Sequence, residues 1–299
     1  MSLSLTVRVF LLTGKSIEKL VEDIYSVIEG NGGWDKTLTD YLSGRLTKTI
    51  EGRLEAGSKP RGNYLRMSNL GTSCKRKLWY DINLEGGDVE PLRPPTRLKF
   101  MYGDILEDLL LVLAKAAGHS VEGEQDEMEI KGIKGHRDAV IDGVLIDVKS
   151  ASSYSFEKFK SNNLREEDPF GYIEQLSSYL YASQDDPLVK DKRNAGFLVV
   201  DKVNGNICLD MYDLTKEMVG KEVYVDYIKD LVADEDVPPR DFDPIPHQKS
   251  GNMKLGTYCS YCAYKRECYP GLRTFVPGRG PLLFLTTVKR EPKMREIKE

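Results

Sequence analysis

Alternating apolar and polar positions in the middle of the chain predict strands, and apolar residues three or four positions apart predict helices around them. Strands are predicted at residues 127–131, within 134–150, and at 196–201 and 206–212. Helices are predicted at residues 16–28, 35–50, 102–117, 171–183 and 214–232. In the last of these helices the predicted core positions are four apart, at Val219, Val223, Tyr227 and Leu231. The pattern therefore predicts a sheet with helices packed around it.

Residues 134–150, KGHRDAVIDGVLIDVKS, are predicted to form a β-hairpin. The Asp-Gly pair at 142–143 separates two aliphatic runs and favours a type I′ turn. With the turn at these residues, Asp138 lies opposite Asp147, and side chains alternate between two faces. One face is apolar, and the other carries Asp138, Asp147 and Lys149 and is expected to look outward.

Two directly opposed carboxylates destabilise a sheet unless a cation lies between them. A divalent metal ion is the obvious candidate, because Asp138 and Asp147 offer the oxygen ligands that such ions prefer. Lys149 lies on the same face and can hold or deprotonate a water molecule near the metal. The plainer alternative is a solvated face on which Asp147 and Lys149 form a surface ion pair. The apolar packing face on the other side of the hairpin favours the metal site.

The chain has 299 residues, 40% of them hydrophobic and 30% charged, which fits a soluble globular protein with a substantial core. The net charge of −4 provides no overall basic field, so nucleic-acid binding would depend on local basic patches. No apolar run approaches the roughly 20 residues of a membrane span. The first 14 residues lack a basic leader and a convincing cleavage site, so we predict no signal peptide. These features predict a cytoplasmic protein that does not enter the membrane.

The five cysteines are unevenly distributed, and three of them fall within residues 258–270, YCSYCAYKRECYP. In an apparently cytosolic protein, such spacing favours a metal centre over disulfides. The candidate ligands are Cys74, Cys259, Cys262 and Cys268. Four thiolates suit either zinc or an iron–sulfur cluster. The fifth cysteine, Cys208, lies between two aliphatic residues and is predicted to be a buried structural thiol.

Two stretches combine basic and aromatic residues. In residues 67–80, MSNLGTSCKRKLWY, a helix capped by Ser68 is expected to run through Cys74, and its basic triplet and two aromatic residues suit a nucleic-acid strand. The alternative is that the two aromatic residues belong to the core and the basic side chains are solvated. Residues 155–165 offer Lys158 among others, either as a substrate-side patch or as an amphipathic surface helix.

The hairpin motif also resembles a known family. Gly135, Asp138, eight intervening residues and then Asp147-Val148-Lys149 resemble the PD-(D/E)xK nuclease superfamily. Within that superfamily the sequence looks most like the RecB-type and Cas4-type nucleases that carry an iron–sulfur cluster. The resemblance covers roughly residues 67–270.

Three further motifs carry the resemblance. Cys74 begins a Cys-x-Arg-Lys-x-x-Tyr stretch similar to the context of the first cluster cysteine in related nucleases. Gly103 and Glu107 fit the Gly-x-x-x-Glu form of a metal-site helix motif, although many iron–sulfur members have histidine there, which leaves the number of catalytic metals open. Gln175 and Tyr179 fit the Gln-x-x-x-Tyr marker of RecB-type nucleases, in which both residues line the active site.

The resemblance implies an α/β fold with a central mixed β-sheet flanked by helices, a restriction-endonuclease-like core and an iron–sulfur-clasped subdomain. The implied organisation is an accessory N-terminal helical segment at 1–66, a nuclease core at 67–270 whose two ends supply the cysteines, and a C-terminal tail at 271–299. The implied activity is metal-dependent DNA exonuclease hydrolysis of phosphodiester bonds, on single-stranded DNA ends, in recombination, repair, replication or CRISPR adaptation.

The resemblance also assigns roles. The Mg²⁺ or Mn²⁺ ligands would be Asp138, Asp147, the Val148 carbonyl and Glu107. Lys149 would activate the attacking water, Gln175 and Tyr179 would orient substrate or the lysine, and a [4Fe–4S] cluster on the four cysteines would be structural. The alternatives are a non-catalytic iron–sulfur or zinc DNA-binding or adaptor protein, and a zinc-clasped interaction protein without a nucleic-acid role.

Overall fold

The computed structural model describes residues 14–56, 63–84 and 94–297. The N-terminal stretch 1–13, in which we predict no signal peptide, lies outside these ranges. Within the described ranges, no helix combines the length and the apolar character that crossing a membrane requires.

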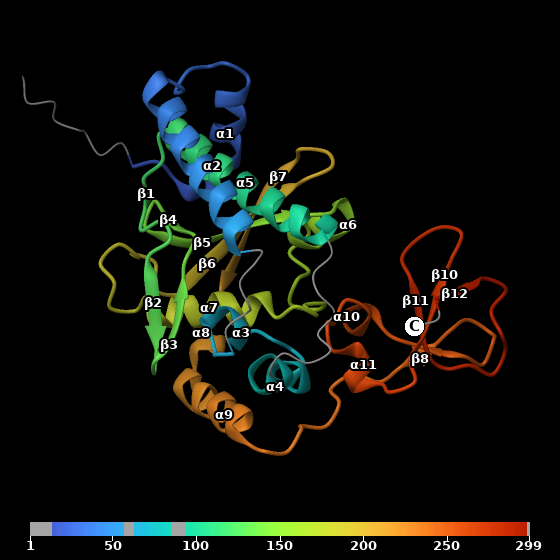
Figure 1. Ribbon diagram of the computed structural model, residues 1–299. Helices are drawn as coiled ribbons and strands as arrows, with labels where there is room; N and C mark the ends of the chain where they lie inside the picture. Colours follow the sequence, from blue (N-terminus) through green and yellow to red (C-terminus); the bar gives the residue numbers. More distant parts are fainter. Residues whose placement is uncertain (1–13, 57–62, 85–93, 298–299) are drawn as a thin grey trace, which may run out of the picture.

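A five-stranded sheet forms the centre of the molecule, with the order β1-β4-β5-β6-β7 (Figure 1). Its strands are β1 (Val121–Glu122), β4 (Ala139–Ile141), β5 (Val144–Ala151), β6 (Asn194–Asp201) and β7 (Ile207–Asp213). Strands β5 and β6 run parallel, and the other neighbours are antiparallel. The expected α/β architecture with a mixed central sheet flanked by helices is therefore confirmed.

The β4–β5 hairpin has the predicted register. Ile141 pairs with Val144, and the next two pairs follow along the strands. Asp142 and Gly143 both have positive φ angles, 51° and 84°, as a type I′ turn requires. The Asp142 carboxylate accepts a hydrogen bond from the Ser120 N–H and holds this turn in place.

Helices cover both faces of the sheet. One face packs on α1 (Leu20–Ile28) and α5 (Pro94–Ala116). The other packs on α3 (Met67–Leu70), α4 (Lys75–Asn83), α6 (Ser153–Lys160), α7 (Tyr172–Ala182) and α9 (Lys221–Ala233). The expectation that the polar face of the hairpin looks outward is therefore wrong. Val140 and Leu145, which share that face with the carboxylates, are buried in one cluster with Leu176 and Leu180 of α7.

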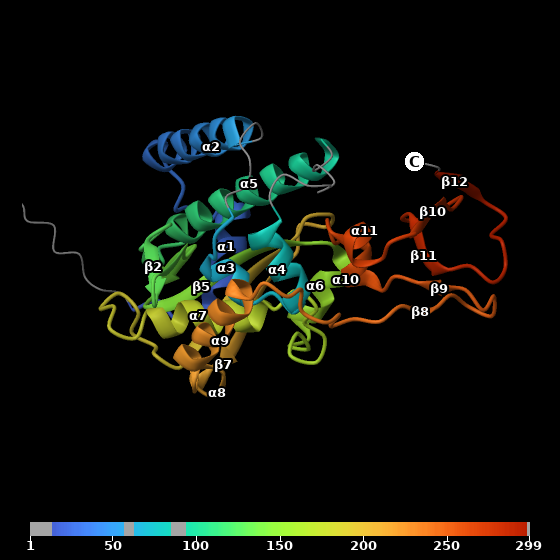
Figure 2. The same cartoon turned by 60° about the horizontal axis from the view of Figure 1, so that its bottom comes forward.

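The long helix α2 (Lys36–Ala56) lies along α5 and away from the sheet (Figure 2). It has no continuous apolar stripe, and polar contacts hold it instead. Arg45 Nε lies 2.6 Å from the Asp108 carboxylate, and Thr49 donates a hydrogen bond to the same group at 2.6 Å. The remaining elements of the main body are η1 (Ile17–Lys19), β2 (Glu127–Ile130), β3 (Ile133–His136) and α8 (Thr215–Met218).

The C-terminal part forms a second five-stranded sheet beside the main body, with the order β12-β10-β11-β9-β8 (Figure 1). Its elements are β8 (Ile245–Pro246), β9 (Met253–Lys254), α10 (Thr257–Ser260), α11 (Lys265–Cys268), β10 (Arg273–Val276), β11 (Leu283–Thr287) and β12 (Arg295–Ile297). The stretch 271–299, expected to be a tail, thus contributes three strands. This stretch has few apolar residues of its own. It can still form a small core, because Phe284 packs on Leu255 and Tyr269, which lie outside the stretch.

Two helices differ from expectation. The segment around Cys74 forms α3 and α4 separately, and Cys74 is the N-cap of α4, where its sulfur accepts a hydrogen bond from the Lys77 N–H. The helix predicted at 214–232 is interrupted at Gly220, whose φ is +71°. This interruption resets the helical phase, so that the buried apolar positions of α9 are Val225, Ile228 and Val232, whereas Val223 is 73% exposed.

Substitutions on the buried and exposed faces of α9 are expected to lower the free energy of unfolding by different amounts. Ile228→Ala removes a fully buried side chain and is expected to lower the free energy of unfolding by about 2–5 kcal/mol. Val223→Ala, on the exposed face, is expected to change it by no more than about 0.5 kcal/mol. Chemical denaturation of the two variants measures the difference, and equal costs would contradict the helical phase described above.

Candidate active site and cysteine pocket

The acidic residues of the hairpin gather around one lysine. Asp147 and Lys149 are two apart on β5, so they share one face of the strand, and Lys149 Nζ lies 2.5 Å from Asp147 Oδ1. Asp138 immediately precedes β4, and its Oδ2 accepts a hydrogen bond from the Val148 N–H at 2.7 Å. The hairpin itself thus brings together two carboxylates, one ammonium and the backbone of the residue between Asp147 and Lys149.

Glu107 reaches this group from helix α5. A side chain at Gly103 would place its Cβ 3.3 Å from Ser150 Oγ, so a glycine at this position lets α5 approach β5 closely. Gln125, which sequence analysis did not identify, donates a hydrogen bond to Glu107 Oε1 at 2.8 Å. The Gly-x-x-x-Glu spacing therefore places the carboxylate one helical turn beyond the point of close approach.

Burial and neighbouring negative charge raise the pKa values of Glu107 and Asp138. Burial and the charge of Asp147 raise the pKa of Glu107 to about 7. Burial, followed by the charges of Asp147 and Glu107, raises the pKa of Asp138 well above its usual range. Each group therefore pays an electrostatic penalty for ionising beside the others, and an added cation would relieve it.

Lys149 is the positive charge of the site. Burial disfavours its ammonium form, but the charges of Asp147 and Asp138 outweigh burial and raise the pKa of Lys149 above its usual range. Its Nζ also lies 5.4 Å from the ring centroid of Tyr172, in a cation–π arrangement. Lys149 is thus held as a hydrogen-bond donor, and the structure does not favour a neutral amine that removes a proton from water.

Helix α7 lies behind the hairpin and supplies tyrosines. A Cβ at Gly135 would lie 2.8 Å from the Tyr179 hydroxyl oxygen, which explains a glycine ahead of Asp138. Burial and then the charge of Asp147 raise the pKa of Tyr179 above its usual range. Gln175 is half-buried, one turn before Tyr179 on the same helix. Tyr172 was not identified from sequence, although its spacing of seven residues from Tyr179 places both on one side of α7.

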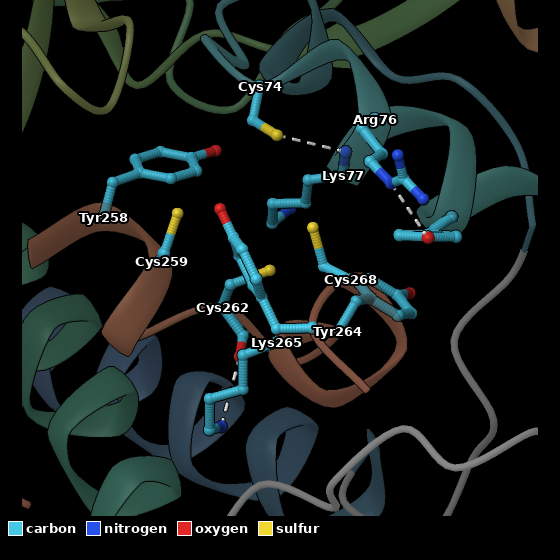
Figure 3. A pocket seen from close by; sticks show the side chains of 11 residues that line it. Cys74, Arg76, Lys77, Tyr258, Cys259, Cys262, Tyr264, Lys265 and Cys268 are labelled. Carbon is cyan, nitrogen blue, oxygen red and sulfur yellow. Dashed lines mark hydrogen bonds between the residues drawn. The ribbon is translucent and has the colours of Figure 1, made fainter. Parts of the chain in front are cut away.

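The four predicted cysteine ligands line one pocket, and their sulfur atoms lie around a common space in Figure 3. They come from the N-cap of α4, from α10, from the turn after α10 and from the end of α11: Cys74, Cys259, Cys262 and Cys268. Burial raises the pKa of Cys74 to about 12, and burial with the neighbouring Cys262 and Cys268 raises that of Cys259 to about 11. Cys208 lies on β7, outside this pocket.

The four cysteine thiols and the hairpin carboxylates are suited to different metal groups. Among the residues described, no three histidine, cysteine or acidic side chains converge on a position for one metal ion. Zinc would require thiolates about 2.3 Å from a single centre, whereas each cysteine of a [4Fe–4S] cluster binds a different iron. Four thiols around one pocket are a donor set for either group. Asp138 and Asp147 fit Mg²⁺, which is usually bound through one or two carboxylates together with water and substrate phosphate.

The aromatic residues after Cys74 follow the plainer interpretation, whereas the basic side chains are half-buried and paired, for example Lys77 with Asp81. Trp79 and Tyr80 are buried, and Tyr80 packs against Tyr264 with the ring centroids 5.4 Å apart. Arg76 Nε donates a hydrogen bond to the Tyr80 hydroxyl. These rings are therefore core residues of the cysteine pocket and do not form a platform for nucleic-acid bases.

No family model and no curated protein matches this sequence. Among solved structures, the crystal structure of SSO0001 is similar over 76% of this chain and 94% of that chain, with 17% sequence identity and a TM-score of 0.41. A TM-score this low does not establish a shared fold, so nothing about this chain is inferred from that protein.

Removing one charge from the acidic group is expected to stabilise the metal-free protein. Because folding raises the pKa of Glu107 from 4.5 to about 7, the unfolding free energy falls as the pH rises through this window. Glu107→Gln is expected to be more stable than the wild type at pH 8 by on the order of 1–3 kcal/mol, and the difference should shrink toward pH 4.5. Thermal unfolding in EDTA measures this, with the exposed Glu51→Gln as control. A Glu107→Gln variant that is less stable than the wild type at pH 8 would contradict an unfavourable ionisation of Glu107 in the folded protein.

The cysteine pocket predicts which thiols bind the cofactor. Cys74→Ala is expected to remove bound iron and visible absorbance from the purified protein. Cys208→Ala, which changes a half-buried thiol outside the pocket, is expected to retain both. Iron and zinc analysis of the two variants, purified without oxygen, is the measurement. Equal iron in both would exclude Cys74 as a ligand.

Proposed function

We propose that this protein is a metal-dependent DNA exonuclease that hydrolyses phosphodiester bonds, acting on single-stranded ends. The observation that carries the proposal is the group formed by Glu107, Asp138 and Asp147 around Lys149. Burial and then the charge of Asp147 raise the pKa values of Glu107 and Asp138, and a bound divalent cation would relieve this cost of ionisation. The resemblance of the Asp138 and Asp147-Val148-Lys149 motif to PD-(D/E)xK nucleases supports the same activity.

Each side chain has a role in this proposal. Asp138 and Asp147, with the Val148 carbonyl and Glu107 beside them, would hold Mg²⁺ or Mn²⁺, which supplies Lewis-acid chemistry and an activated water. Lys149, kept charged by its two carboxylate neighbours, donates to the attacking water or to a phosphate oxygen and stabilises the charge that develops there. Tyr172 orients the ammonium through its ring.

The cysteine pocket has a structural role in the proposal. A [4Fe–4S] cluster on the four thiols would join α4 to the C-terminal segment that carries α10 and α11. All five strands of the central sheet lie between Cys74 and Cys259 in the sequence, so such a link would restrict the unfolded chain strongly. Recombination, repair, replication and CRISPR adaptation are all compatible settings for this activity.

The direct test is cleavage of end-labelled single-stranded and double-stranded DNA, with Mn²⁺ and with EDTA. Asp147→Ala and Lys149→Ala are each expected to lower Mn²⁺-dependent cleavage by at least about 10²-fold, since one removes a metal ligand and the other the charge-stabilising donor. Lys249→Ala, at an exposed lysine outside the site, serves as the control.

Two results would count against the proposal. Unimpaired Mn²⁺-dependent cleavage by both variants would reject the roles assigned to Asp147 and Lys149. DNA binding by the wild type without any cleavage in Mn²⁺ would instead assign the protein to the non-catalytic DNA-binding or adaptor class.

A further inference from the structure

A second pocket is lined by Lys149 and lies beside the candidate active site. Its volume is about 210 Å³, and it lies between the end of β5, helix α6 and the loop that leads into α7. The lining residues that matter here are Lys149, Lys158, Lys202, Asp168, Phe170 and Tyr172. Only Lys149 and Lys158 among them were considered from sequence. A pocket that begins at the candidate catalytic lysine is placed to hold the substrate next to the reacting bond.

The pocket offers cations to an anionic ligand. Lys158 pairs with Glu167 at 2.9 Å, but Glu167 is 64% exposed, and exposed pairs of this kind contribute little stability. A phosphate can therefore replace Glu167 at small cost. Lys202 has no carboxylate partner within the described ranges. Ser152 also lines the pocket and carries a hydroxyl group.

The pocket also presents an aromatic ring held in position. Phe170 is 47% exposed, and its ring centroid lies 5.7 Å from that of Tyr172 and 6.1 Å from that of Tyr258. The preceding residue is fixed as well, because Ser73 Oγ donates a hydrogen bond to the Pro169 carbonyl at 3.1 Å. An exposed ring that needs no ordering on binding is suited to stacking on a planar ligand.

A carboxylate, Asp168, makes one part of the pocket wall acidic. Asp168 Oδ2 accepts a hydrogen bond from the Ile173 N–H at 2.9 Å, which fixes the group at the start of α7. Its Oδ1 is buried and has no hydrogen-bond partner in the described part of the chain. A phosphate is repelled from this end and attracted to Lys158 and Lys202, whereas an amino or hydroxyl donor of the ligand fits beside Asp168.

We propose that this pocket binds one unstacked nucleotide of a DNA single strand, with its base on Phe170 and its phosphate on Lys158 and Lys202. The inference rests on the nuclease function proposed above and adds the group that selects single-stranded substrate. A base within a duplex is stacked and paired, so it reaches Phe170 only after it has been unpaired. The pocket therefore discriminates against duplex before any chemistry at Lys149.

The experiment measures binding in EDTA, where no cleavage competes, by fluorescence anisotropy of labelled single-stranded and duplex DNA. Phe170→Ala is expected to weaken single-strand binding about 5- to 100-fold, the range that stacking on one aromatic ring contributes. Phe170→Trp, which keeps a ring, is expected to bind like the wild type. Tyr227→Ala removes a ring of matched exposure, 50%, on α9 and is expected to leave affinity unchanged.

The cations are tested by salt dependence. Lys202→Ala is expected to reduce the slope of log affinity against log salt concentration by about 0.7, the contribution of one phosphate contact with a single strand. Lys249→Ala should leave the slope unchanged. An RNA strand of the same sequence is measured in parallel, and tighter binding of RNA than of DNA would overturn the assignment to DNA.

Failure of this inference can be told from failure of the proposed function. Unchanged affinity in Phe170→Ala, equal losses in Phe170→Ala and Tyr227→Ala, or wild-type binding to duplex as tight as to single strand would each overturn the pocket assignment, even if Mn²⁺-dependent cleavage is observed. Single-strand binding that follows the expected pattern without cleavage would support the pocket and reject the nuclease.

Discussion

Repulsion among buried carboxylates is the constraint on which the rest of this molecule depends. Glu107 lies on a helix, Asp138 just before a strand and Asp147 within the next strand, and burial followed by the charge of Asp147 raises the pKa values of Glu107 and Asp138. The positive charge of Lys149 offsets only part of this repulsion. Transferring charged groups from water into a protein interior is unfavourable. Such a group of carboxylates therefore persists only when the surrounding packing holds it in place.

The packing that holds it is extensive. The apolar face of the hairpin belongs to a cluster with α1 and α5, and the residues beside the carboxylates belong to a second cluster with α7. Helix α5 also carries Asp104 and Asp108 on either side of Glu107, and both are paired with arginines of α2, Arg53 and Arg45. The polar helix α2 thus holds the carboxylates on either side of Glu107 in ion pairs, and the charges of Asp108 and Asp104 still raise the pKa of Glu107.

The candidate active site and the cysteine pocket share structural supports. Tyr258, which lines the cysteine pocket, contacts Phe170, and Phe170 contacts Tyr172 beneath Lys149. On the other side, a Cβ at Gly71 would lie 2.2 Å from the Gly171 carbonyl oxygen, so α3 and the start of α7 meet without room for a side chain. The segment that precedes Cys74 and the segment that precedes Cys259 therefore both contact the loop that lines the pocket beside Lys149.

Local sequence determined the hairpin, its turn and its register, because the Asp-Gly turn at 142–143 fixes which residues of the two aliphatic runs lie opposite each other. It also determined the spacing that brings Asp147 and Lys149 to one side of β5. Tertiary structure alone decided that this side is covered by α7, that α9 buries Val225, Ile228 and Val232, and that Tyr172, Gln125 and Phe170 join the site. Sequence periodicity indicates which residues share one face of a helix or strand. Which other helix or strand covers that face is decided by packing between segments far apart in the chain.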